Sequence, residues 1–396
     1  MKKIILVMDG ASDLPLEELD GRTPMQAART PNLDALAAKG RVGKTSPAPE
    51  DMELGSDVAN MAILGYDPHR YYTGRAPLEA ASMGIPVQGE DVAFRVNLVA
   101  TDGETMRDHS AGGLTTEEGR ELVDFLQKKL FHTNDARRLY PGVGYRHLMI
   151  WADGPDSLRC VPPHNIVGQH FVRYMPEGDK DQSIRRKIWD SLEVLDSHPV
   201  NERRRAEGKL PANMIWPWGP GRTPSLPPFR DVRGTGGAMI AAVDLLKGLG
   251  KLAGLSTPDV PGATGYVETN WRGKAQYALD ALAGDADFAC VHVEGPDEAG
   301  HQGELEAKIF AIEKIDEELL GPLLDGLRAL GDFRLLVLPD HSTPVKLRKH
   351  DSYNVPFLFY DSANEETNGL PFDEAGMRKT RFKVPEGYQL IDLLFP

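Results

Sequence analysis

The chain has 396 residues, which is too long for one ordinary hydrophobic core and predicts two domains, or one large α/β domain that carries an insertion. Its 41% hydrophobic and 26% charged residues are typical of a soluble globular protein, and a net charge of −14 disfavours a general binder of nucleic acid or anionic membranes. Cys160 and Cys290 lack a Cys-x-x-Cys spacing, so we expect neither a disulfide framework nor a zinc knuckle, and a cytoplasmic location fits.

The first predicted element is a buried strand at residues 4–8, with the sequence IILVM. Asp9 ends this apolar run too early for a signal peptide or a membrane span. The next element is a helix that ends at Gly40. Thr30 is predicted as its N-cap and Pro31 as its first helical residue.

The residues after this helix satisfy a relaxed phosphate-loop pattern with Gly43, Lys44 and Thr45. A phosphate loop needs a strand before it and a helix after it, so that the helix N-terminus faces the phosphate. Here a helix ends at Gly40 and two prolines follow. We therefore reject a nucleotide site at this point.

The middle of the chain, from about residue 75 to residue 218, combines long polar helices with strand candidates and predicts an inserted domain. Residues 216–229 are dense in Pro, Gly and Trp, and they are predicted as a crossing between domains, neither strand nor helix. The chain is expected to return to the first sheet near Gly234. The helical and strand patterns of the middle lie at residues 92–100, 115–130, 145–152 and 183–209.

Three further apolar runs predict strands at residues 288–293, 334–339 and 355–360. Between them, Leu305, Ile309, Ile312 and Leu319 recur near a 3.6-residue period and predict an amphipathic helix. Alternating strands and helices indicate a mostly parallel sheet with helices on both faces. The predicted domains are a discontinuous core of residues 1–74 and 225–396, and an inserted, smaller α/β domain of residues 75–224.

Metal-ligand side chains follow several of the predicted strands. Taken singly, each has an ordinary alternative, such as a turn cap, a hydrogen bond to a backbone carbonyl or a solvated loop. The carboxyl ends of parallel strands meet at one edge of a sheet, so we expect these side chains to converge. Mixed oxygen and nitrogen ligands suit Mn²⁺, Zn²⁺ or Mg²⁺. The candidates are Asp9, Asp297, His301, Asp340, His341 and His350.

A hydroxyl group is predicted at the head of a short helix, where Ser56 stands at the N-cap position and the helix runs to Ile63. The helix dipole and the free backbone N–H groups there favour a serine alkoxide or an attached phosphate. The alternative is a plain N-cap serine.

The motifs GSDVAN, PDEAGH and PDHSTP, followed by His350, resemble in order and spacing the metal and nucleophile set of the alkaline-phosphatase superfamily. More narrowly, they resemble the archaeal-type cofactor-independent phosphoglycerate mutases. The resemblance extends into GATGYVETNWRGKA and VHVEGPDEAGHQGELEAKIFAIEKID, whereas the middle domain matches only loosely. It implies an alkaline-phosphatase-like sheet.

The resemblance also implies a mechanism with two divalent metal ions, foremost Mn²⁺. Ser56 would attack the phosphate of 3-phosphoglycerate, form a phosphoserine and return the phosphoryl group to the neighbouring hydroxyl, without 2,3-bisphosphoglycerate. One metal would be held by Asp9, Ser56, Asp340 and His341, and the other by Asp297, His301 and His350.

The resemblance further implies that the inserted domain grips the carboxylate of a small phosphorylated substrate and shields the phosphoserine from water. Arginine can bind a carboxylate through two hydrogen bonds. Each candidate also has an ordinary reading as a surface or helix residue. The candidates are Arg75, Asp108, His109, Arg146 and Lys247.

Two rival functions stay open at this point. A group of close relatives proposed to be homoserine kinases resembles this chain too, but a kinase requires a nucleotide pocket, for which we find no other sequence signal. The second rival is a binding protein with purely structural metals. A structural site has no need of a nucleophile such as Ser56 at the head of a helix.

Overall fold

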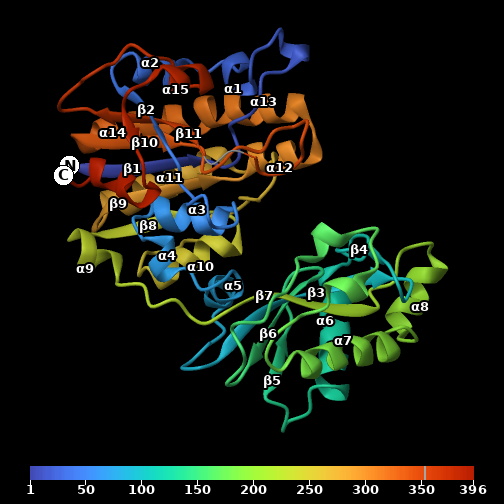
Figure 1. The fold of residues 1–396 in the computed structure, drawn as a ribbon. Helices are drawn as coiled ribbons and strands as arrows, with labels where there is room; N and C mark the ends of the chain where they lie inside the picture. The colour runs from blue at the N-terminus through green and yellow to red at the C-terminus, as the bar shows by residue number, and fades with distance from the viewer. Residues whose placement is uncertain (352–353) are drawn as a thin grey trace. The chain divides into compact units, whose positions relative to one another are not determined.

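The computed structural model describes residues 1–351 and 354–396, and these form two compact units (Figure 1). One unit consists of Met1–Tyr72 and Ser225–Pro396, and the other of Thr73–Pro224. The second unit is thus inserted into the sequence of the first. Within the described residues, no helix has both the length and the apolar character that a membrane span requires.

The larger unit is built on seven strands: β1 (Lys2–Met8), β2 (Arg41–Thr45), β8 (Gly236–Ile240), β9 (Ala286–Val293), β10 (Phe333–Leu338), β11 (Val355–Asp361) and β12 (Lys383–Val384). Their order in the sheet is β12-β2-β11-β10-β1-β9-β8. Most neighbours are parallel, but β11 runs antiparallel to both β10 and β2. The predicted mostly parallel sheet is confirmed.

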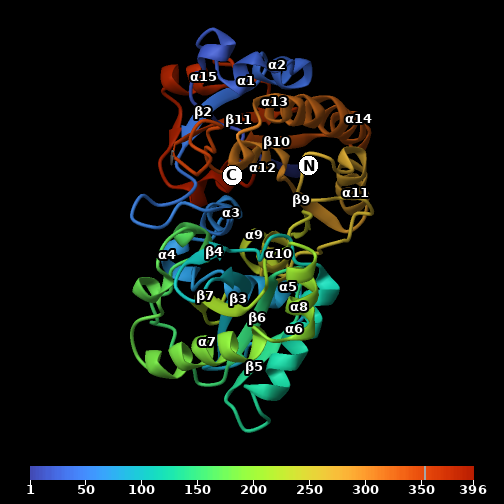
Figure 2. The ribbon, with the colours of Figure 1, turned by 90° about the vertical axis from the view of Figure 1, so that its right-hand side faces the viewer.

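Helices cover both faces of this sheet, as predicted. In Figures 1 and 2, α13 (Leu305–Lys314) and α14 (Gly321–Leu330) lie on one face, and α3 (Ser56–Ile63) and α10 (Asp244–Leu252) on the other. The further helices are α1 (Pro24–Ala27), α2 (Pro31–Ala37), α4 (Pro68–Tyr71), α9 (Phe229–Arg233), α11 (Trp271–Ala283), α12 (Gly295–Gln302), α15 (Glu374–Lys379), η1 (Glu17–Leu19), the π-helix η4 (Ile315–Leu320) and η5 (Gly387–Leu393).

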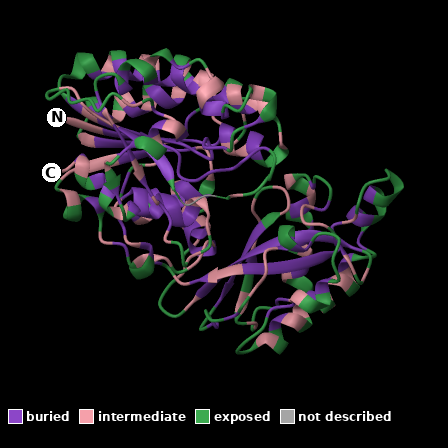
Figure 3. Cartoon of the chain, turned by 45° about the horizontal axis from the view of Figure 1, so that its top comes forward, coloured by how far each residue is buried: buried purple, intermediate pink, exposed green. Residues whose placement is uncertain are grey.

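The core of the larger unit lies between the sheet and its helices. Alternate residues of a strand point to opposite faces, and Ile4, Leu6 and Met8 of β1 belong to a buried cluster that includes residues of α11, η4 and α14. Figure 3 shows the central strands buried and the exposed residues on the outer surfaces of the helices. Burial on both faces explains why the central strands read as continuous apolar runs.

Sequence reasoning misses β2, which contains Gly43, Lys44 and Thr45. The strand pairs with β11, where Lys44 lies opposite Pro356. A Cβ atom on Gly43 would lie 2.1 Å from the ring of Phe357, so glycine is required there by packing. The rejected phosphate-loop pattern is therefore part of a strand.

Two predicted helices differ from expectation in detail. α2 begins at Pro31, but Thr30 makes no side-chain cap, because the carboxylate of Asp316 accepts the N–H groups of Asn32 and Leu33. α2 also ends at Ala37, before Gly40. In the later helix, Leu305 and Ile309 are half-buried whereas Ile312 and Leu319 are fully buried, and the helix becomes π-helical from Ile315 onward.

The inserted unit has a five-stranded antiparallel sheet of β3 (Val92–Thr101), β4 (Met106–Asp108), β5 (Arg137–Tyr140), β6 (Arg146–Trp151) and β7 (Met214–Gly221). It has its own buried core, which includes Phe94, Met149 and Trp216. Its helices are α5 (Ala76–Ser82), α6 (Thr116–Lys129), α7 (Asp181–Leu195), α8 (Pro199–Ala206), η2 (Pro163–Ile166) and η3 (Phe171–Tyr174).

The prediction of a crossing over residues 216–229 is wrong for its first part, which belongs to β7. Trp216 is fully buried, and its Nε1 donates to the carbonyl of Val161 at 2.8 Å. Trp218 donates to Asn97 Oδ1 at 2.9 Å. Tryptophan burial thus holds this Pro- and Gly-rich segment as a strand, and its pairing along β3 tolerates proline at the sheet edge.

The chain enters and leaves the inserted unit at one place. The hydroxyl of Thr73 donates to the carbonyl of Arg222 at 2.6 Å. Gly74 has a φ of +135°, and a Cβ atom there would lie 2.1 Å from the carbonyl oxygen of Pro220. The two crossings therefore lie side by side, and glycine is needed for their close approach.

Candidate metal centre and nucleophile

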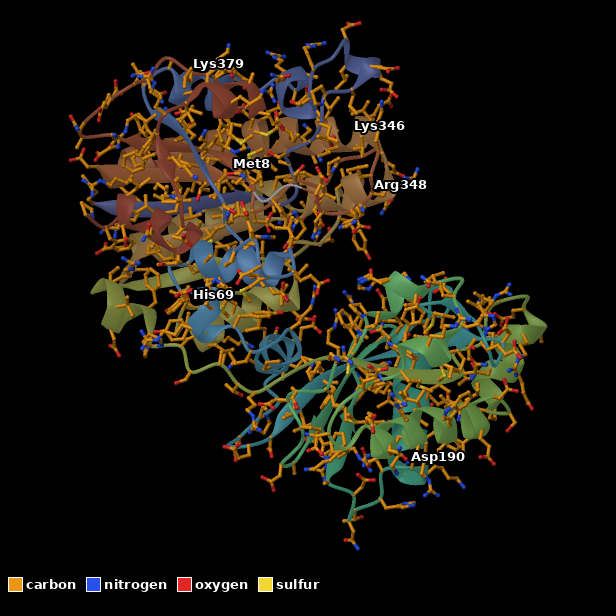
Figure 4. The ribbon with its side chains drawn as sticks, viewed as in Figure 1. Met8, His69, Asp190, Lys346, Arg348 and Lys379 are labelled. Atoms are coloured by element: carbon orange, nitrogen blue, oxygen red, sulfur yellow. The ribbon has the colours of Figure 1, made fainter. Side chains whose placement is uncertain are left out.

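The candidate ligands gather at one edge of the larger sheet. Asp9 follows β1, directly after Met8, which Figure 4 labels. Asp340 and His341 follow β10, and α12 follows β9 and carries Asp297 and His301. His350 precedes β11, whose antiparallel direction places its beginning beside the ends of the parallel strands.

The first ligand group consists of Asp9, Asp340 and His341, whose ligand atoms lie within 4.8 Å of one another. His341 Nε2 is 3.4 Å from Asp9 Oδ1 and 3.6 Å from Asp340 Oδ2. All three side chains are buried. Asp9 Oδ1 has no hydrogen-bond partner among the described residues, which is costly for a buried carboxylate unless a cation binds it.

The second ligand group consists of Asp297, His301 and His350, again with ligand atoms within 4.8 Å. His301 Nε2 is 3.4 Å from Asp297 Oδ2, and His350 Nε2 is 3.6 Å from Asp297 Oδ1. The two Nε2 atoms are 3.1 Å apart. The rings of His341 and His350 stack with centroids 3.8 Å apart, so the two groups adjoin.

In His301 and His350, the ring nitrogen that faces away from Asp297 is Nδ1, and it has a hydrogen-bond partner of its own. His301 Nδ1 donates to the carbonyl of Arg348 at 3.1 Å, and His350 Nδ1 donates to that of Leu54 at 2.9 Å. Figure 4 labels Arg348. Because a carbonyl only accepts hydrogen bonds, each Nδ1 carries a proton, and each Nε2 lies on the side of the ring that faces Asp297. This is the usual arrangement of metal-binding histidines.

The electrostatics also favour bound cations. Burial raises the pKa of Asp9 well above its ordinary value, and the charges of Asp340 and Asp297 raise it further. Burial lowers the pKa of His341 to about 4, so this imidazole is neutral at pH 7 and keeps a lone pair. The carboxylates of Asp9, Asp297 and Asp340, together with the imidazole nitrogens, form a donor set that fits divalent metal ions.

Ser56 lies beside the first ligand group. The prediction that it is an N-cap is wrong by one residue, because Gly55 is the N-cap and Ser56 is the first residue of α3. Its hydroxyl does not cap its own helix, and Oγ lies 3.1 Å from His341 Nε2. The N-terminus of α3 thus presents a hydroxyl group to the ligand cluster.

Sequence reasoning misses Asn60, one turn after Ser56 on α3. Asn60 Nδ2 donates to Asp340 Oδ2 at 2.8 Å and to the carbonyl of Ser56 at 2.9 Å. It therefore ties α3 to the first ligand group. The motif GSDVAN contains both Ser56 and Asn60. Residues four apart share one face of a helix, so their spacing could have indicated that Asn60 faces the site.

Sequence reasoning also misses a series of buried, charged side chains that lead away from Asp9. His292 Nε2 is 3.5 Å from Asp9 Oδ2, His292 Nδ1 is 3.3 Å from Glu294 Oε1, and Lys274 pairs with Glu294 at 2.8 Å. Burial lowers the pKa of His292, but its hydrogen bonds and ion pairs with Asp340 and Glu294 outweigh this and raise the pKa to about 9. A charged His292 compensates part of the negative charge of the cluster.

Two of the substrate-binding candidates share a neighbour in the inserted unit. The ring of His109 lies 5.9 Å from that of Tyr145, and the guanidinium of Arg146 lies 5.8 Å from the same ring. His109 is also 6.1 Å from His164, whose ring lies 5.5 Å from Trp218. His164 and Trp218 extend this group of rings, and the sequence did not single out either one as a candidate.

The other three candidates have different surroundings. Arg75 pairs with Glu79 at 3.2 Å, and Asp108 accepts hydrogen bonds from Ser110 within its own turn. Lys247 stands on α10 in the larger unit and pairs with Asp259 at 2.6 Å. Each of these three side chains is therefore already paired with a neighbour of its own.

Comparison with known proteins gives full-length relatives. The family model described as 2,3-bisphosphoglycerate-independent phosphoglycerate mutase matches residues 37–201. The chain is 46% identical to a protein of Geobacter sulfurreducens named probable 2,3-bisphosphoglycerate-independent phosphoglycerate mutase, over 100% of this chain and 99% of that protein. It is 47% identical, with the same coverage, to a Methanothrix thermoacetophila protein named 2,3-bisphosphoglycerate-independent phosphoglycerate mutase.

Comparison with solved structures also gives matches over the full length of the chain. A protein from Pyrococcus horikoshii superposes with a TM-score of 0.82 at 30% identity and covers 100% of this chain and 96% of that one. A cofactor-independent phosphoglycerate mutase from Thermoplasma acidophilum superposes with a TM-score of 0.65 at 28% identity, over 100% of this chain and 99% of the other.

Proposed function

Because the chain belongs to the family of 2,3-bisphosphoglycerate-independent phosphoglycerate mutases, we propose that it interconverts 3-phosphoglycerate and 2-phosphoglycerate with Ser56 as the nucleophile. The activity makes it an isomerase. The observation that carries the proposal is the position of Ser56 Oγ, 3.1 Å from His341 Nε2 and at the head of α3. A purely structural metal site would not need a hydroxyl group there.

Two divalent ions are part of the proposal. The seven proposed ligands include three imidazoles, which favour a transition metal, and Mn²⁺ is our first choice. When bound, the ions would polarise the phosphoryl oxygens and lower the pKa of the serine hydroxyl. Asp9, Ser56, Asp340 and His341 would hold one ion, and Asp297, His301 and His350 the other.

The chemistry moves one phosphoryl group within one substrate. Ser56 Oγ loses its proton and attacks the phosphorus of 3-phosphoglycerate, the bond from phosphorus to the C3 oxygen breaks, and that oxygen gains a proton. The C2 hydroxyl of the glycerate then loses its proton and attacks the phosphoserine, the bond from phosphorus to Ser56 Oγ breaks, and Ser56 regains a proton. The positive end of the α3 helix dipole, where Ser56 stands, favours the negative phosphoryl group throughout. No second phosphorylated donor is needed.

For the substrate carboxylate, we keep the five candidates, and His109 and Arg146 have the strongest support because both adjoin Tyr145. Arg75, Asp108 and Lys247 would first have to give up the partners described above. Arg146→Gln should raise the KM for 3-phosphoglycerate, whereas the same change at exposed Arg138 should not. An unchanged KM for Arg146→Gln would remove this residue from the substrate site.

The experiment that tests the function follows products by ³¹P NMR. The metal-loaded protein is incubated with 3-phosphoglycerate alone and, separately, with homoserine and ATP. We expect 2-phosphoglycerate in the first tube and no phosphohomoserine in the second. The opposite result would support the kinase, which is already disfavoured because Lys44 lies within β2 and the full-length relatives carry the mutase name.

A further inference from the structure

Thr343 lies between the two ligand groups and belongs to neither. It stands in the loop after β10 and is fully buried. Its Oγ1 lies 2.5 Å from Asp297 Oδ1, in the second group, and 3.2 Å from His341 Nδ1, in the first. One hydroxyl group therefore contacts a ligand of each proposed metal ion.

Counting protons fixes the direction of these two hydrogen bonds. A threonine hydroxyl has one proton to donate, and an ionised carboxylate only accepts. Thr343 therefore donates to Asp297, and its remaining lone pair accepts a proton from His341 Nδ1. His341 must then carry its proton on Nδ1, so that Nε2 has a lone pair. That lone pair faces Ser56 Oγ at 3.1 Å and Asp9 Oδ1 at 3.4 Å.

We propose that Thr343 is a positioning residue that couples the two metal sites, because it selects the metal-binding tautomer of His341 and at the same time orients the carboxylate of Asp297. The inference rests on the two-metal site of the proposed function. It explains how the outer nitrogen of His341 is occupied, since His301 and His350 use backbone carbonyls for the same purpose.

The backbone around Thr343 is held rigidly. Lys308 is fully buried, and its Nζ donates to the carbonyl of Thr343 at 2.8 Å and to that of Ser12 at 3.2 Å. Lys308 also pairs with Asp13 at 2.8 Å. The loop after β10 is thus fixed to the loop after β1 before any ion binds, which is what a preorganised site requires.

Helix α12 approaches Thr343 closely enough that only glycine fits. A Cβ atom on Gly300 would lie 2.3 Å from the carbonyl oxygen of Thr343. Asp297 is one turn earlier on the same helix, so this contact sets the distance from its carboxylate to the Thr343 hydroxyl.

The ordinary alternative is that the Thr343 hydroxyl only satisfies buried polar groups, which would affect stability but not metal affinity.

Three variants of the full-length protein separate the two roles. Thr343→Val removes the hydroxyl at nearly constant volume, Thr343→Ser keeps it, and Thr380→Val is the matched control. Thr380 is buried in the same unit and donates to the carbonyl of Val42 at 2.7 Å, with no contact to a proposed ligand. Metal-free protein is titrated with Mn²⁺ against a competing chelator, and bound metal is counted by mass spectrometry.

We expect two ions in the wild type and both affinities weakened about tenfold to a hundredfold in Thr343→Val, the usual effect of losing a partner of a metal ligand. Thr343→Ser and Thr380→Val should bind both ions as the wild type does. Two ions at wild-type affinity in Thr343→Val, or a loss confined to one site, would overturn the coupling but leave the proposed function intact. A wild type that binds no metal would instead overturn the proposed function itself.

A second measurement does not depend on metal binding or on the folding of a variant. In metal-free wild-type protein labelled with ¹⁵N-histidine, the His341 signals are assigned by their loss in His341→Gln. Thr343 predicts that a singly protonated His341 ring carries its proton on Nδ1. A ring protonated on Nε2 would contradict the inference, whatever the titrations give.

Discussion

The histidine residues of the site share one feature, which is that each outer nitrogen has its own partner. The partners are two backbone carbonyls and the hydroxyl of Thr343. The three Nε2 atoms face the carboxylates of Asp9, Asp297 and Asp340. A site of this kind is built before the metal arrives, and its affinity should depend on each histidine separately.

Removing the metal should remove the activity. We expect that chelation abolishes the mutase reaction and that Mn²⁺ restores it better than Ca²⁺, because imidazole ligands suit a transition metal better than a hard, oxygen-seeking ion. His301→Ala and His350→Ala should each lower the bound metal, measured by mass spectrometry. The matched control is His69→Ala, an exposed histidine of the same unit labelled in Figure 4.

Two results would contradict this assignment. Equal rescue by Ca²⁺ would favour an oxygen-only site. Full metal occupancy in both His301→Ala and His350→Ala would show that the second ligand group does not hold an ion.

At the scale of the element, the sequence predicts the central strands well because burial on both faces leaves a continuous apolar run, as in β1, β9 and β10. It misses β2 and β7, whose glycines and prolines are typical of turns. These two strands exist because remote residues pair with them, Phe357 against Gly43 and Val161 with Trp216. Such pairings cannot be read from a local pattern.

The same distinction applies to the site. Residues with metal-ligand side chains at strand ends could be selected from the sequence, and the structure places them in two adjoining groups. Residues that support them could not, because threonine, asparagine and lysine are common and their partners are remote. Thr343 contacts Asp297, 46 residues away, and Asn60 contacts Asp340, 280 residues away.

Strand β6 contains a histidine that should make the inserted unit sensitive to acid. His147 is buried, its Nδ1 accepts from the N–H of Gly142, and its Nε2 has no partner among the described residues. Burial lowers its pKa to about 3, below the value of about 6.5 in an unfolded chain. As pH falls from about 6.5 toward 3, the unfolded chain takes up a proton that the folded unit excludes, so the stability that is fully present above pH 6.5 is progressively lost.

The slope of this loss should approach about 1.4 kcal/mol per pH unit. Denaturant unfolding at pH 7, 5 and 4 can be followed by tryptophan fluorescence, because Trp151, Trp189, Trp216 and Trp218 lie in the inserted unit and only Trp271 outside it. In His147→Gln the contribution of His147 to this slope should be absent. The exposed-residue control His170→Gln should show the same pH dependence as the wild type. Identical pH dependence in wild type and His147→Gln would refute the assignment.

At the scale of the whole molecule, two units with separate cores share one chain. The inserted unit has its own sheet and buried cluster, and its two crossings lie together at Thr73 and Arg222. Insertions whose ends are close in space disturb the host fold little. All seven proposed metal ligands lie in the larger unit.

The units should therefore be separable. With residues 73–224 replaced by a short Gly/Ser linker, the remaining chain should bind two metal ions, and it should retain slow phosphatase activity toward a small phosphate ester but lose mutase activity. Metal counting and a coupled assay for 2-phosphoglycerate measure these outcomes. Mutase activity in the shortened chain would show that the inserted unit does not bind the substrate.

The covalent intermediate on Ser56 is the central claim, and trapping it is the most direct test. Protein quenched during turnover with 3-phosphoglycerate, without nucleotide, should carry phosphate on the peptide that contains GSDVAN. Ser56→Ala should lose both this label and the mutase activity. The variant should still fold and bind at least one metal ion, because Ser56 makes no helix cap of its own. If Ser56→Ala interconverts 3- and 2-phosphoglycerate at the wild-type rate, the account of the mechanism is contradicted even if both ions sit where we place them.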